Sequence, residues 1–264
     1  MSPKLIFNLS YVSILMIATL IITMVFSYLF ALTTDEHHNG KHMGITGWNF
    51  YISCSWKNDK SRTVATFGIP IVAFFMLTLI SARFLQLKAV FGRSSALLKL
   101  SLVTGIIACL GLVGASAVTL KQNKRLHLII AGICFMSAYV CQVALHSIES
   151  LLSKKDQGEV NASHKVFYMR RFLAVIAFFC GVVMTCSTAF ANSSGSVHDA
   201  TKPQTHLRWW FAGSLAEVIL TICFMMSITS FGFDLKSLQY ELTLAPTSGS
   251  HSKPSADLVA DPNV

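Results

Sequence analysis

The sequence predicts an all-α membrane protein built as a bundle of six transmembrane helices. Hydrophobic residues make up 53% of the 264-residue chain, charged residues make up only 12%, and the mean hydropathy is +0.57. About a quarter of the residues in a soluble domain are charged. The apolar residues also gather into six runs, and a helix needs roughly 20 such residues to cross about 30 Å of hydrocarbon. Composition and run length therefore lead to the same fold class.

The six predicted spans follow one another with polar segments between them. They are Ile6–Leu32, Val64–Ala82, Leu100–Leu120, Leu126–Leu152, Phe172–Ala191 and Trp209–Phe233. The first run follows Lys4 as a signal peptide would, but it is longer than a 7–15-residue signal core, so we expect an uncleaved span. The third contains small residues that permit close helix approach, namely Gly105, Gly111, Gly114, Ala115 and Ser116.

The chain divides into a six-span domain over residues 1–242 and a tail over residues 243–264. Pro, Ser and Gly dominate the tail, so we expect it to be disordered and cytosolic. Such a tail could bind a cytosolic protein adaptor, although a merely solubilising terminus fits its composition better. Residues 1–242 are expected to hold every membrane-embedded group.

Basic residues favour cytosolic termini. With both termini inside, the inner segments hold twelve lysines and arginines, including Arg83 and Arg170, and the outer segments hold nine. The inner loop Lys154–Arg171 carries several of them and could bind anionic lipid. The net charge of +9 needs no nucleic-acid partner, because basic residues beside spans set topology. Asn192 begins a glycosylation sequon on the predicted outer side and is a candidate glycosylation site.

No cofactor, metal or catalytic motif is predicted. Six of the seven cysteines lie in spans, where cysteine behaves as a small hydrophobe, and there is no CxxC zinc pair. His127 and His146 lie about 28 Å apart on one helix, which does not suit the axial ligands of a haem. The outer-loop histidines His37, His38 and His42 lack a second ligand pair, and no hydrolase or P-loop motif is present.

Polar and aromatic residues share one face of the fourth predicted span. At 100° per residue, an arc of roughly 120° holds His127, Ala131, Phe135, Ala138, Tyr139, Gln142, His146 and Glu149. Lipid solvates such groups poorly, so this face is expected to point into the bundle. His127 should lie near the outer surface and Glu149 near the inner one, which leaves Gln142 as the deepest polar group.

Glu217 is the one carboxylate expected inside the sixth span. A charged glutamate there costs roughly 2.5 kcal/mol or more unless it is paired, neutral or hydrated. His127 is at a similar depth, so we expect Glu217 to pair with His127 or with water in an outer-side cavity. The hypothetical polar network comprises His127, Gln142 and Glu217. It would be either a lipid or ligand site or, with more weight, a structural hydrogen bond that sets helix order.

The order of these features resembles the DRAM-like family of six-span membrane proteins. The similar positions are Ile52 and Ser53 in the first outer loop, His127, Phe135, Tyr139 and Gln142 in the fourth span, and Glu217 and Phe231 in the last. Phe50 stands where the family usually has proline, and Cys54 replaces an acidic residue. The family includes damage-regulated autophagy modulators, Sfk-type regulators of phosphoinositide 4-kinase and Frag-type proteins of GPI-anchor lipid remodelling.

The resemblance implies a polytopic protein of the endomembrane system, the lysosome or the plasma membrane. Its implied function is non-enzymatic regulation of autophagy or of phosphoinositide and lipid organisation. The alternative is a lipid-handling protein or enzyme of the GPI-remodelling kind, with His127 and Glu217 in an outer-side pocket. A small-solute transporter fits less well, because inverted repeats and broken helices are missing and only Pro70 interrupts a span.

Overall fold

Six long helices dominate the computed structural model, which describes residues 4–32, 59–91, 95–118, 122–155, 164–193, 204–234 and 239–243. The helices are α1 (Leu9–Leu32), α3 (Asp59–Phe91), α4 (Ala96–Ala117), α5 (Lys124–Lys155), α6 (His164–Ser193) and α7 (Gln204–Asp234). Each contains a stretch long and apolar enough to cross a membrane. The predicted six-span, all-α membrane fold is confirmed.

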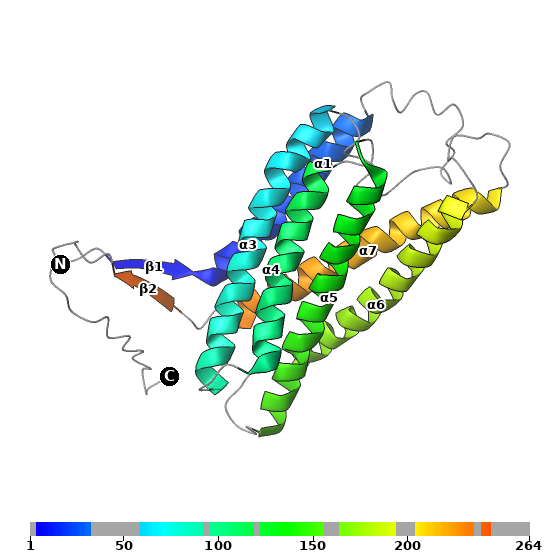
Figure 1. Ribbon diagram of the computed structural model, residues 1–264. Coiled ribbons are helices and arrows are strands. Elements are labelled where there is room, and N and C mark those ends of the chain that lie inside the picture. The colour runs from blue at the N-terminus through cyan, green and yellow to red at the C-terminus, as the bar shows by residue number, and fades with distance from the viewer. Residues whose placement is uncertain are drawn as a thin grey trace.

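The helices form a row joined to a hairpin. Figure 1 shows α3, α4 and α5 side by side, with α1 packed against α3 and with α6 paired with α7. One apolar core lies among α1, α3, α4, α5 and α7. A smaller one, which includes Leu173 and Phe224, joins α5, α6 and α7. We call the end where α1 begins and α7 ends the proximal end, and the opposite end the distal end.

Two short strands meet at the proximal end. β1 (Lys4–Asn8) and β2 (Gln239–Thr243) pair antiparallel, with Ile6 opposite Glu241. The prediction that the first span begins at Ile6 is therefore wrong, because the backbone of residues 6–8 pairs with β2 and the helix begins at Leu9. β2 also extends one residue past the predicted domain boundary. Thr243, the first residue of the predicted disordered tail, therefore belongs to β2, and the rest of that tail, from residue 244 onward, lies outside the described residues.

Two helices continue well beyond their predicted spans. α3 runs to Phe91 rather than Ala82, and α6 begins at His164 rather than Phe172. Arginines interrupted the apolar runs at these places, but the helical pattern of buried side chains continues through them. Arg83 is followed four residues later by buried Leu87, and Arg170 three residues later by buried Leu173.

Small residues set the spacing of the helices, as predicted for α4. A Cβ atom added at Gly111 would lie 2.8 Å from Cβ of Cys134 on α5. One added at Gly105 would lie 2.9 Å from Cγ2 of Ile80 on α3. Both distances are too short for real carbon atoms, so α4 lies closely between its neighbours only because these positions are glycine.

Candidate functional site

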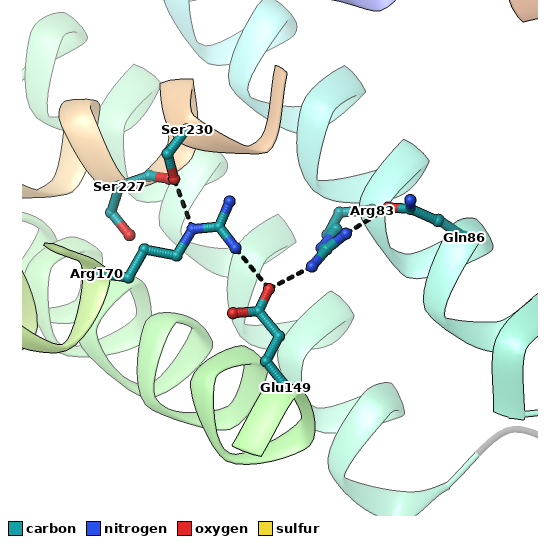
Figure 2. Close-up of polar contacts among 6 residues, drawn as sticks. All are labelled: Arg83, Gln86, Glu149, Arg170, Ser227 and Ser230. Carbon is teal, nitrogen blue, oxygen red and sulfur yellow. Dashed lines mark hydrogen bonds and ion pairs between the residues drawn. The ribbon is translucent and has the colours of Figure 1, made fainter. Parts of the chain in front are cut away.

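A buried ion cluster lies at the proximal end of the bundle (Figure 2). One carboxylate oxygen of Glu149 accepts hydrogen bonds from Arg83, at 2.5 Å, and from Arg170, at 2.8 Å. The exposed fractions are 7% for Glu149, 3% for Arg83 and 2% for Arg170. Three charged residues from α3, α5 and α6 thus meet where almost no solvent reaches them.

Further polar contacts extend the cluster to a fourth helix. The second amino group of Arg83 donates to the side-chain oxygen of Gln86 at 2.5 Å. Nε of Arg170 donates to Oγ of Ser230 on α7 at 2.6 Å, and that hydroxyl donates to the carbonyl oxygen of Ser227. The sticks in Figure 2 show this chain running from α3 through α5 and α6 to α7.

The pairing explains how the bundle tolerates these charges. An isolated charge inside a membrane is costly, so charged residues there face the bundle interior and contact one another. Attraction between buried ions repays desolvation only with good geometry and additional hydrogen bonds. Gln86 and Ser230 supply such bonds here. The cluster therefore joins α3, α5, α6 and α7 at the proximal end.

A small cavity lies beside the cluster, among α3, α4, α5 and α7. Its volume is about 20 Å³, and the residues around it include Gln142, Ser227 and Phe231. Gln142 is 7% exposed, and among the described residues neither atom of its amide group has a hydrogen-bond partner. Gln142 is thus buried as predicted, its amide group has no hydrogen-bond partner among the described residues, and the residue borders the cavity.

The predicted pair of His127 and Glu217 is not formed. Nδ1 of His127, which is 2% exposed, donates instead to the carbonyl oxygen of Val118 at 2.5 Å. This bond joins the start of α5 to the end of α4. Glu217 is buried on α7, also toward the distal end. No contact among the described residues joins His127, Gln142 and Glu217 into one network: His127 lies near the start of α5, Gln142 near its middle, and Glu217 on α7.

The aromatic positions of the family motif form the contact between α5 and the α6–α7 hairpin. The rings of Phe135 and Phe224 are stacked, with centroids 6.2 Å apart. The rings of Tyr139 and Phe178 are tilted relative to each other, with centroids 6.1 Å apart. Phe231 lies beneath the guanidinium group of Arg170, at 4.9 Å, and also lines the cavity. These motif residues connect the ion cluster to the cavity and to the helix interface.

Sequence reasoning placed Glu149 correctly on the inward face but missed its partners. The hydropathy pattern predicts Arg83 and Arg170 to be inner-loop charges, because each lies just outside an apolar run. For Arg83, the sequence does contain a hint of burial. Leu79 and Leu87 lie four residues before and after it, so all three side chains are on one face of the helix, and both leucines are buried. His146, on the same face, stacks on Phe167 of α6 with ring centroids 4.5 Å apart.

The burial of Arg83 and Arg170 changes both the predicted charge balance and the predicted lipid-binding loop. Without the buried Arg83 and Arg170, ten basic residues remain on the predicted inner side, against nine outside. Within the predicted Lys154–Arg171 loop, both ends are helical, and Arg170 is unavailable to lipid while Arg171 is exposed. Residues 156–163 of this loop lie outside the described residues.

Other predicted positions fall at or beyond the edges of the described structure. Asn192 lies in the last turn of α6, at the distal end. Ile52 and Ser53, and the outer-loop histidines, lie outside the described residues. Within the described ranges, no group of three or more His, Cys, Asp or Glu side chains could hold a metal ion.

The chain was also compared with known proteins. Residues 8–238 match the family model described as the Frag1/DRAM/Sfk1/Cwh43P N-terminal domain. The matched range begins just before α1 and ends beyond α7, so it covers the whole helical bundle. Neither the comparison with curated proteins nor the comparison with solved structures returned a match.

Proposed function

Because this chain belongs to the Frag1/DRAM/Sfk1 family, we propose that it is a non-enzymatic membrane regulator of lipid organisation. Its processes would be those suggested by the family resemblance, either autophagy or the control of phosphoinositides. The proposed location is the endomembrane system, the lysosome or the plasma membrane. Both termini would be cytosolic, which places the ion cluster toward the cytosolic side.

The observation that carries this proposal is the arrangement of the buried charges. Glu149, Arg83 and Arg170 contact one another and neighbouring helices, and so hold four helices in register. A catalytic site instead needs a nucleophile or base within hydrogen-bond reach of its orienting partner. His127, the histidine of the enzymatic alternative, donates its Nδ1–H to the carbonyl oxygen of Val118 and not to Glu217. A bundle held in register can present its proximal surface and its tail to a partner.

The proposal is tested by complementation in cells that lack the protein. Wild-type chain, Glu149→Gln and a chain truncated after Leu242 are expressed at matched levels. Phosphatidylinositol 4-phosphate is measured with a fluorescent binding domain, and autophagic flux with a turnover assay. We expect wild type to restore one of these readouts. Loss of that readout on truncation, with the bundle still folded, would assign the partner contact to the tail.

The enzymatic alternative makes a different prediction in the same cells. His127→Ala and Glu217→Gln are compared with wild type for abundance, localisation and the lipid composition of GPI anchors. Suppose that wild type changes the lipid composition of GPI anchors and that either variant, at unchanged abundance and localisation, does not. The regulator proposal would then be wrong, and the chain would be a GPI-anchor-remodelling enzyme. Proximity labelling from the C-terminal tail, with organelle imaging, then identifies the partner and the membrane.

A further inference from the structure

The cavity beside Gln142 has an unusual combination of features. It is bordered by four helices, and most of its surroundings are apolar, such as Ile80, Leu145 and Phe224. The exceptions include Gln142 on α5 and Ser227 on α7. Both residues are buried, with exposed fractions of 7% and 2%. Polar residues from two helices therefore border one small space inside the bundle.

The amide group of Gln142 needs a partner that the described residues do not supply. Its nitrogen has hydrogen atoms to donate and its oxygen has lone pairs to accept, yet neither makes a hydrogen bond in the described part of the chain. A buried polar group without a partner costs about 1–3 kcal/mol. Native proteins rarely leave such a group unsatisfied, and buried water often fills the role.

We propose that this cavity binds one uncharged hydroxyl group, which hydrogen-bonds to Gln142 and lies between Gln142 and Ser227. The inference goes beyond the proposed function and stands without it. A hydroxyl group both donates and accepts, as the amide requires. A volume of about 20 Å³ is enough for a single oxygen atom, since one water needs roughly 10–15 Å³ by this measure. A charged group is disfavoured because burial of an unpaired ion costs far more than burial of a neutral group.

Two sources can supply the same chemistry. One is a buried water molecule. The other is the single hydroxyl group of a neutral membrane lipid, such as a diacylglycerol, whose acyl chains would stay outside this small cavity, among the lipid chains around the bundle. The two sources differ in one measurable respect, because only lipid binding depends on the lipid composition of the membrane. Stability rises with the concentration of a ligand that binds only the folded state.

The test is a double-mutant cycle on the full chain in nanodiscs. Gln142→Met keeps the length of the side chain and removes its polar groups, and Ser227→Ala removes the hydroxyl on α7. The thermal midpoint of each single variant and of the double variant is measured in dioleoylphosphatidylcholine, with and without dioleoylglycerol. Ser147→Ala is the control, since that hydroxyl is also on α5 but bonds its own backbone at Val143.

We expect Gln142→Met to lower the midpoint by about 2–4 °C, the shift that corresponds to a lost hydrogen bond in a chain of this size. The double variant should lose less than the sum of the two single losses, because both residues contact one guest. Ser147→Ala should change little and should add to Ser227→Ala. If dioleoylglycerol raises the thermal midpoint of wild type but not that of Gln142→Met, the bound hydroxyl group belongs to a lipid. If dioleoylglycerol raises neither midpoint, the bound hydroxyl group belongs to water.

A higher midpoint for Gln142→Met than for wild type would overturn the proposal, because removal of an unsatisfied group stabilises a protein. Strict additivity of Gln142→Met and Ser227→Ala would overturn it as well, since a shared guest must couple them. Should Gln142→Met fail to fold, Gln142→Asn replaces it in the same cycle. That variant keeps the amide but draws it back by one carbon, so the same loss and the same coupling are expected.

Discussion

Glu149 has the largest number of charged partners among the residues of the candidate site. Its position on the inward face of α5 could be predicted from helical periodicity, because it lies seven residues after Gln142. Its partners could not be predicted, since Arg83 and Arg170 come from helices whose rotation about their axes is set by packing. Sequence spacing relates residues within one helix, whereas the contacts of Glu149 join three.

Replacement of Glu149 should destabilise the bundle strongly. Glu149→Gln removes the one carboxylate that both arginines contact and leaves two buried cations facing each other. We expect the free energy of unfolding to fall by roughly 3–5 kcal/mol, the cost of removing one partner from a buried ion pair. The measurement is reversible unfolding in detergent micelles, followed by circular dichroism.

Asp59→Asn is the matched control for this substitution. Asp59 is an exposed carboxylate in the first turn of α3, at the distal end, and its replacement should change the unfolding free energy by less than about 1 kcal/mol. Equal and small effects of the two substitutions would show that the ion cluster contributes little to stability.

The packing of α4 shows how well a single element can be predicted. The small residues of this span indicate close helix approach, and the structure confirms it at Gly105 and Gly111. The sequence does not show which neighbour each glycine faces, because that depends on how α3 and α5 are placed around α4. The ends of α3 and α6 were predicted poorly, since hydropathy falls at Arg83 and Arg170 although the helices continue.

Two glycines of adjacent helices should respond in opposite ways to the same substitution. Gly111→Ala places a methyl group 2.8 Å from Cβ of Cys134, and we expect a loss of about 1–3 kcal/mol from overpacking. Gly132→Ala on α5 meets no atom within 4 Å, so the higher helix propensity of alanine should stabilise by up to about 1 kcal/mol. Thermal unfolding of both purified variants measures the difference. A stabilising Gly111→Ala would contradict the close contact of α4 and α5.

The whole molecule combines the row of α3, α4 and α5 with the hairpin of α6 and α7. Six spans follow from composition and run length, and the structure confirms them. An even number of spans also places the segments before the first and after the last on one side, which agrees with the pairing of β1 with β2. The pairing of β1 with β2 could not be predicted, because their partners are more than 230 residues apart and neither strand has a strong pattern. The family resemblance is confirmed over residues 8–238. The contacts of the ion cluster could be seen only in the structure.

The ion cluster and the aromatic motif join the row to the hairpin at different levels. Phe135 and Tyr139 contact α7 and α6 near the middle of α5, whereas Arg170 and Ser230 make their contacts at the proximal end. Through its two arginines, Glu149 keeps the proximal ends of α3 and α6 at one fixed separation.

The separation of these two ends can be measured with spin labels. Spin labels attached through a ketone-bearing amino acid replace Lys88 on α3 and Tyr168 on α6, both exposed, so the natural cysteines stay in place. Electron–electron double resonance in nanodiscs should give one narrow distance distribution in the otherwise wild-type chain. In Glu149→Gln the distribution should broaden and shift to longer distances, while in Asp59→Asn it should remain narrow. An unchanged distribution in Glu149→Gln would contradict the claim that the cluster holds the two ends together.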